Sequence, residues 1–551
     1  MHTARRLYLY LLSGIGLGVL VAGLSLLLTT LFQALGLGGA DVLSGDQAVR
    51  ERLTRASAMS AVALPVWLIH WFLAERGVRP GHPGADVERS SAVRGLYFAL
   101  VLGALMLAMF VGAGSLVEYV VLVLAGDAPE FRDPAGDLGL VLSAAAAWAY
   151  HLRVRIRDWR TGPISGAGAW LPRAYLYAAT FAGLFLLLFG IADLFSLVSR
   201  TVVGAPGPVF DAGQTWWSFP LAGALSRIVV GGAAWAGHWW YANRLWADAS
   251  ERGAVERPAR LRFAYHVAVL VVAAAAAIAF LGQGLSGVLD TAFGTLDDDD
   301  RVFAELVATL LSAALFAIAW WIHAAWLRAS AAESGGPGLA TAEQLAAYPT
   351  AIVGLAFGAV GVGRLVGQLL DALFGGGRVI LGGRVTLEVV ADFVPYALLG
   401  TAVWIWQWSR VTRARRADPI AEGASTVRRA ALLLVLAVSI LAGVAALGTV
   451  LYQLFGTLFG VDAQGDLAVP LGALLAAGAV AAYHGQLLRR DAEVREAVAA
   501  ATPAAAAPAH ELPLVLVAPD GSDAADLARV RQALEDGLPE GYRLRDDRRM
   551  S

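Results

Sequence analysis

The stretch that decides the fold runs from Trp148 to Arg157 and has the sequence WAYHLRVRIR. A tryptophan is followed three residues later by a histidine, and an arginine follows five or six residues after that position in each copy. The order recurs along the chain, with the histidine positions 77–87 residues apart. The six copies are Trp67/His70/Arg76, Trp148/His151/Arg157, Trp235/His238/Arg244, Trp320/His323/Arg328, Trp404/Gln407/Arg413 and His484/Arg490, the last with Ala481 in the tryptophan position. Because spacing and residue type agree independently, the pattern predicts an internal repeat.

The composition places this repeat in a membrane. The 551 residues are 58% hydrophobic and 16% charged, with a mean hydropathy of +0.62. Soluble domains are about 45–50% apolar and about 25% charged, so a soluble enzyme and a disordered chain are excluded. Cysteine is absent, which excludes a disulfide-stapled secreted domain.

Hydropathy predicts about twelve apolar segments of roughly 20 residues or more, each long enough to cross a bilayer. Every repeat holds two of these segments, so each copy enters the membrane in the same direction. We therefore predict an all-α membrane protein with about twelve transmembrane helices, arranged as six parallel two-helix hairpin repeats. Parallel repeats differ from the inverted repeats of many secondary transporters.

The marker positions divide the chain into six repeats and a tail. The tail is an Ala/Pro linker with a small cytoplasmic segment, in which we expect short strands at Leu514–Val517 and Tyr542–Leu544 and a helix from Ser522 to about Leu534. The predicted hairpins are residues 1–80, 90–162, 170–252, 258–335, 345–417 and 425–499, and the tail is 500–551.

Arginine distribution predicts the orientation. The N-terminus and the segments that follow the Trp/His helices are rich in arginine, whereas the opposite loops hold few arginines and the acidic run Asp297–Asp300. The positive-inside rule then predicts a multi-pass protein of a bacterial plasma membrane with both termini in the cytoplasm. The first apolar run, from Leu7 to Leu31, is too long for a signal peptide, so we expect no cleavable signal.

The histidines allow two interpretations. In the structural one, each tryptophan packs between helices, each histidine donates a hydrogen bond to a neighbouring carbonyl, and each arginine extends to lipid phosphates. In the functional one, His70, His151, His238, His323 and His484 lie at one depth and bind haem or a quinone. Gln407 interrupts the series, and an internal repeat retains packing residues automatically, so the structural interpretation is favoured.

Charged residues in the other helix of each repeat differ from copy to copy. Asp193 and Arg227 are predicted at about 25 Å from the cytoplasmic face, so we expect a salt bridge between them. Arg364 could reach Asp392 in the same way. Glu118 and Arg364, together with Asp392, would line a polar path only if they faced a shared water-filled cavity.

The pattern of motifs favours a protein that is not an enzyme. The sequence has no Walker motif, HExxH motif, nucleophile elbow or usefully spaced pair of carboxylates. We therefore predict no catalytic residue, no metal and no cofactor, with haem or quinone as the alternative. Membrane lipids are the expected partners, with a membrane protein or a second copy of the chain also possible. The basic segments are short and separate, so nucleic acid is not expected.

The most consistent function is a non-enzymatic membrane scaffold or subunit that binds lipid or a partner protein. A transporter or channel for a small solute or ion is one alternative. A haem- or quinone-binding electron-transfer protein is the other.

One resemblance supports this architecture. The opening Arg5–Ser13, RRLYLYLLS, is echoed by Arg173–Tyr177, RAYLY. These segments resemble the start of an uncharacterised bacterial repeat domain of two to four helices, classed as a domain of unknown function. The resemblance implies tandem membrane hairpins along most of the chain and carries over no functional residue.

Overall fold

The structure is a computed structural model, and it describes most of the chain. The described residues form helices and no strands. The predicted strands at 514–517 and 542–544 lie outside these residues. The described ranges are 3–37, 46–127, 133–162, 164–204, 215–250, 253, 260–295, 299–333, 338–374, 382–459, 467–501 and 524–537.

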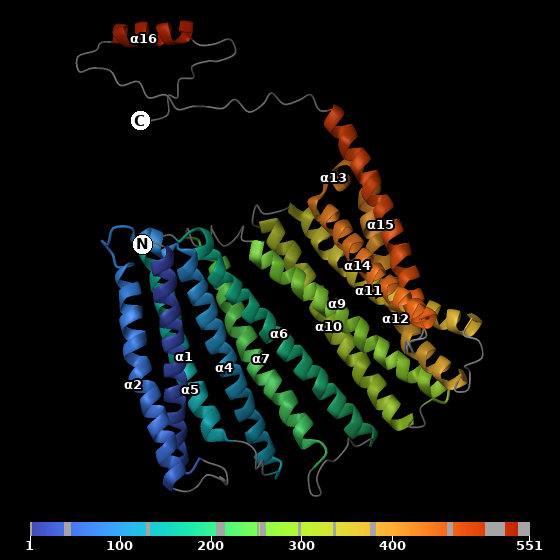
Figure 1. The fold of residues 1–551 in the computed structure, drawn as a ribbon, viewed down its shortest axis with the longest axis horizontal. Helices are drawn as coiled ribbons and strands as arrows, with labels where there is room; N and C mark the ends of the chain where they lie inside the picture. Colours follow the sequence, from blue (N-terminus) through green and yellow to red (C-terminus); the bar gives the residue numbers. More distant parts are fainter. Residues whose placement is uncertain are drawn as a thin grey trace. The chain divides into compact units, whose positions relative to one another are not determined.

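Twelve long helices and three short ones make up the described chain (Figure 1). Each predicted hairpin range overlaps two long helices, although the range boundaries themselves stay predictions. The helices are α1 (Thr3–Ala34), α2 (Asp46–Arg76), α3 (Ala85–Arg89), α4 (Ala92–Leu124), α5 (Pro134–Thr161), α6 (Gly166–Val203), α7 (Ser218–Trp246), α9 (Arg260–Ala292), α10 (Asp299–Glu333), α11 (Gly338–Phe374), α12 (Gly382–Ala417), α13 (Pro419–Ala424), α14 (Thr426–Leu458), α15 (Ala468–Ala501) and α16 (Ala524–Gly537).

Local residues set several helix ends. Asp133 accepts a hydrogen bond from the Gly136 amide at 3.1 Å, and Pro134 occupies the first turn, so α5 begins there. The helix α6 ends at Gly204, whose φ of 78° suits a residue without a side chain. The predicted helix from Ser522 to about Leu534 is observed as α16. This helix belongs to a separate unit, residues 496–551, distinct from the helical unit 1–495.

The long helices pack in three groups of four, which we call bundles. In the first, α1 packs against α2 and α5, and α4 packs against α5; in the second, α6 packs against α7 and α10, and α9 against α10. In the third, α11 packs against α12 and approaches α15 closely at Gly363 and Gly367. A salt bridge joins α14 to α15. Helix α4 also packs on α6 and α7, and α9 on α11 and α12. The bundles therefore follow one another in chain order (Figure 1).

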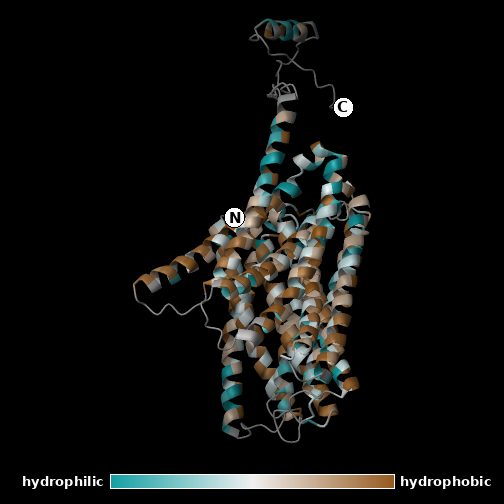
Figure 2. Ribbon diagram, turned by 90° about the vertical axis from the view of Figure 1, so that its right-hand side faces the viewer, coloured by the Kyte–Doolittle hydropathy of each residue, from teal (hydrophilic) through white to brown (hydrophobic). Residues whose placement is uncertain are grey.

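Eleven of these helices are long and apolar enough to cross a membrane. Figure 2 shows apolar residues along most of their length, and large apolar side chains such as Leu100, Val111 and Leu441 face outward. Helix α5 is not among the eleven, and its last part carries several arginines. The outward apolar surface fits a lipid environment, where apolar residues need no burial within the protein.

Close helix contacts depend on glycine. A methyl group on Gly472 of α15 would lie 2.5 Å from the amide nitrogen of Gly367 and closer still to the carbonyl oxygen of Gly363, both on α11. A methyl group on Gly478 of the same helix would have no atom within 4 Å. Small residues at such crossings let the backbones pack, which stabilises helix pairs in lipid.

We expect Gly472→Ala to destabilise the protein by about 1–3 kcal/mol, because the added methyl group forces α11 and α15 apart. Gly478→Ala is the matched control and should be neutral or slightly stabilising, since alanine favours helix by roughly 1 kcal/mol over glycine. Thermal unfolding in detergent micelles measures both. Equal melting temperatures for the two variants would contradict the close α11–α15 crossing.

Candidate functional site: buried arginine centres and a tyrosine–histidine series

The first bundle is built around a buried arginine at the start of α4. Ser91 caps this helix, and its hydroxyl accepts a hydrogen bond from the Arg94 amide at 3.2 Å. The cap places Arg94 in the first turn, where its side chain is 0% exposed. A guanidinium cannot lose its charge inside a protein, so it must be paired there.

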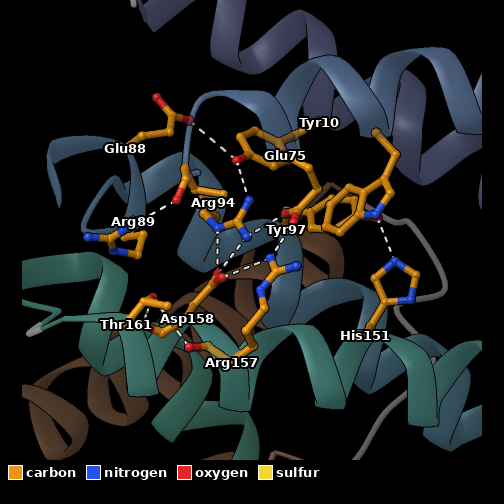
Figure 3. Close-up of polar contacts among 12 residues, drawn as sticks. Tyr10, Glu75, Glu88, Arg89, Arg94, Tyr97, His151, Arg157, Asp158 and Thr161 are labelled. Atoms are coloured by element: carbon orange, nitrogen blue, oxygen red, sulfur yellow. Dashed lines mark hydrogen bonds and ion pairs between the residues drawn. The ribbon is translucent and has the colours of Figure 1, made fainter. Parts of the chain in front are cut away.

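Three other helices supply the partners of Arg94 (Figure 3). Asp158 of α5 accepts from Nε at 2.9 Å and from Nη2 at 2.5 Å. Glu75 of α2 accepts from Nη2 at 2.7 Å, and the Tyr10 hydroxyl of α1 accepts from Nη1 at 2.9 Å. Arg157, about half exposed, contacts both Glu75 and Asp158. We call this set the Arg94 centre, and it joins α1, α2, α4 and α5 at one end of the bundle.

The third bundle repeats this arrangement. Ser425 caps the Arg428 amide at 3.3 Å, as Ser91 does in the first bundle. Arg428 donates from Nε to Asp491 at 2.6 Å and from Nη1 to the Tyr348 hydroxyl at 3.1 Å. Tyr348 in turn donates to Glu422 at 2.5 Å. The Arg428 centre therefore ties α11, α14 and α15 together with the same residue types.

The second bundle keeps the arginine but replaces its carboxylates. Arg262 donates to the side-chain oxygens of Asn243 at 3.0 Å and Ser330 at 3.3 Å, which stand where Glu75 and Asp158 stand in the first bundle. Its guanidinium carbon lies 4.9 Å and 4.4 Å from the ring centres of Trp239 and Trp246. Cation–π contacts therefore help to stabilise the buried guanidinium charge here, as carboxylates do in the other two centres.

The five histidines share one local geometry. In each, Nδ1 lies 2.7–2.9 Å from the carbonyl oxygen four residues earlier in the same helix. Nδ1 therefore carries the proton, and Nε2 is left as an acceptor. The neighbouring carbonyl that each histidine contacts belongs to the histidine's own helix.

Tyrosines from other helices contact four of the five Nε2 atoms. The oxygen–nitrogen distances are 3.4 Å for Tyr8–His70, 2.9 Å for Tyr97–His151, 3.0 Å for Tyr175–His238 and 3.2 Å for Tyr265–His323. In the third bundle Ala431 stands in the tyrosine position, three residues after the arginine, and His484 Nε2 has no hydrogen-bond partner among the described residues. The series thus links helices through Tyr–His pairs.

The outer charged residues lie apart from these centres. Arg227 Nη2 is 2.6 Å from Asp193 Oδ2, in a salt bridge between α6 and α7 whose side chains are each almost half exposed. The Arg364 guanidinium on α11 lies 4.8 Å from the Phe393 ring centre. Glu118 lies on α4, and Asp392 on α12. The cavity described below is lined by other residues.

Sequence reasoning missed the arginine centres. Arg94, Arg262 and Arg428 lie in the first turns of α4, α9 and α14. Their acidic or polar partners stand seven residues after His151, His323 and His484. This second regularity is visible in the repeat. Marker spacing and hydropathy do not reveal it, because the partners of each arginine lie on other helices.

The repeat is also the feature that known proteins share. The family model described as a domain of unknown function, DUF5671, matches residues 6–150, 173–320 and 344–483. These matches cover most of the chain. The protein belongs to this family. Each match spans most of two predicted hairpins, so one copy of the family domain corresponds to one four-helix bundle. No curated protein and no solved structure matches the chain.

Removing the central arginine should strongly destabilise this DUF5671 protein. Arg94→Met removes the buried cation shared by Asp158 and Glu75 and leaves them only the half-exposed Arg157, so we expect a loss of about 3–5 kcal/mol in thermal unfolding. Arg157→Met is the matched control, because it contacts the same carboxylates from a half-exposed position and should cost about 0–1 kcal/mol. Asp158→Asn combined with Arg94→Met should cost less than the sum of the two single changes. Additive losses would show that the Arg94 centre is not a coupled unit.

Proposed function

We propose that this chain is a non-enzymatic multi-pass membrane scaffold or subunit that binds lipid or a partner protein. The observation that supports this most is that buried polar side chains are paired with side chains of neighbouring helices. Arg94 and Arg428 are paired with carboxylates of neighbouring helices, and four of the five histidines are paired with tyrosines. These groups hold helices together, which is the role expected of structural polar residues in a membrane.

We further propose twelve spans in a bacterial plasma membrane, with α5 as the twelfth and both termini in the cytoplasm. The Arg94 centre supports this, because Tyr10 and Arg94 lie at the starts of α1 and α4, whereas Glu75 and Asp158 lie at the ends of α2 and α5. Helices that run alternately up and down bring these ends together.

Cysteine labelling tests the role of α5, since the chain has no native cysteine. Pro83→Cys follows α2 and Ser250→Cys follows α7, and both residues are exposed. If α5 crosses the bilayer, a membrane-impermeant maleimide should label both positions from the same, cytoplasmic, side. Leu37→Cys, after α1, is the control for the opposite side. Labelling of Pro83→Cys and Ser250→Cys from opposite sides would reduce the number of spans to eleven.

The geometry supports the two rival functions less well. A redox carrier needs histidine nitrogens that can ligate haem or bind a quinone, and in four of the histidines both ring nitrogens already have partners. A transporter or channel needs a polar path. Asp193 is paired with Arg227, and Arg364 stacks on Phe393, so these charges have structural contacts of their own.

One preparation tests all three functions. We expect the full chain, purified from a haem-competent host, to show no Soret band and to contain no extractable quinone. In liposomes it should conduct ions no faster than the Arg364→Leu variant or empty vesicles. A Soret band lost in His151→Phe would establish the redox function. Ion flux lost in Arg364→Leu would establish the transport function, and either result would overturn the scaffold proposal.

A further inference from the structure

A large cavity opens between the first and second bundles. It has a volume of about 700 Å³ and lies between α5, α6 and α7, with Leu102 of α4 at its side. One face of each helix contributes: Leu152 and Trp159 from α5, Pro172 from α6 and Trp240 from α7. The volume is within the range of small-molecule sites, about 300–1,000 Å³.

Arginines gather at one end of this cavity. Arg155 is buried, and although its Nη2 donates to the Gly168 carbonyl at 2.8 Å, its Nε and Nη1 have no hydrogen-bond partner among the described residues. Arg173, also buried, and the exposed Arg160 and Arg244 line the same end. Asp248 is the one carboxylate in the lining, so positive charge predominates. Unpaired buried N–H groups of a cation are costly unless an anion meets them.

The other end of the cavity is mostly apolar, and the polar side chains there, Tyr175 and His238, are hydrogen-bonded to each other at 3.0 Å. Trp148 lies seven residues before Arg155 on α5, so the lining continues for about 10 Å toward the middle of the helix. Leu102, Ala233 and Gly237 surround this inner part, and a methyl group on Gly237 would have no atom within 4 Å. The cavity is therefore amphipathic along the helix axis.

The arginine is a departure from the repeat. The residue four positions after the histidine is Arg155 in the first bundle, Leu327 in the second and Leu488 in the third. At the next junction, α10 packs directly against α11, and Leu327 and Ala331 are buried against α11 residues. An apolar residue at this position therefore packs against the next bundle. Where Arg155 and Trp159 replace the equivalents of Leu327 and Ala331, the helices leave a cavity between the bundles.

We propose that this cavity binds the phosphate-bearing headgroup of an anionic phospholipid. The phosphate meets Arg155 and Arg173, and one acyl chain lies along Leu152 toward Gly237. Burial of the Arg155 nitrogens and the apolar inner end favour an amphiphile over a free anion. This inference rests on the proposed function and names the lipid class that the scaffold binds.

Titration of the delipidated full chain tests the site. Short-chain phosphatidylglycerol, phosphatidylcholine and inorganic phosphate are added in a neutral detergent, and binding is followed by native mass spectrometry and melting temperature. Phosphatidylglycerol should bind and raise the melting temperature, phosphatidylcholine should bind more weakly, and inorganic phosphate should have little effect.

Two variants separate headgroup from chain. Arg155→Met should weaken phosphatidylglycerol binding about tenfold or more by removing charge-assisted hydrogen bonds. Gly237→Leu should weaken it similarly by filling the inner end. The controls are Arg429→Met, an exposed arginine of the third bundle, and Gly18→Leu, whose added side chain also begins in open space.

Unchanged binding in both Arg155→Met and Gly237→Leu would overturn the proposal. Equal protection by inorganic phosphate would identify a free-anion site, and equal binding of phosphatidylcholine would show that only the acyl chain is recognised; each also overturns it. These readouts are independent of haem content and ion flux. Failure of the lipid site and failure of the scaffold proposal are therefore distinguishable.

Discussion

The fold depends on pairing a permanently charged arginine inside a largely apolar protein. Arg94 is fully buried, and its partners come from α1, α2 and α5. Apolar packing does not distinguish well between lipid and a neighbouring helix, because both are equally apolar. A buried guanidinium does distinguish them, since it is stable only where the carboxylates and hydroxyl converge. The Arg94 and Arg428 centres therefore specify which helices meet and at which end.

Much of the fold was predictable from the sequence. Composition and hydropathy predicted long apolar helices, and the Trp/His spacing predicted the repeat, because both are properties of one segment at a time. The size of the family domain was not predictable from that spacing. Successive hairpins differ in detail: His70 and His238 are partly exposed, whereas His151, His323 and His484 are buried. The helix contacts and the extent of the family matches are what indicate that two hairpins form one unit.

The site was predicted in part, and the reason is physical. Asp193 and Arg227 lie on adjacent helices of one hairpin, so their depths could be compared by counting residues. The partners of Arg94 come from three other helices, and the contact spans 64 residues to Asp158 and 84 to Tyr10. The depth of a residue along its helix does not show which of several helices it contacts, because all of them have residues at the same depth. The cavity at Arg155 forms between helices of two bundles, so the sequence pattern of a single helix does not predict it.

Differences among the three bundles say more about function than their common residues do. Residues retained in all three bundles, such as Arg94, Arg262 and Arg428, hold together helices that every bundle contains. The second bundle carries His266 where the others have Phe98 and Leu432, and both ring nitrogens of His266 lack partners among the described residues. Arg155 departs from two leucines in the same way. Such departures cost stability, because each leaves a polar group buried without full compensation. His266 is not among the residues that line the cavity, whereas Arg155 is, so an anionic ligand bound in the cavity would compensate the cost at Arg155.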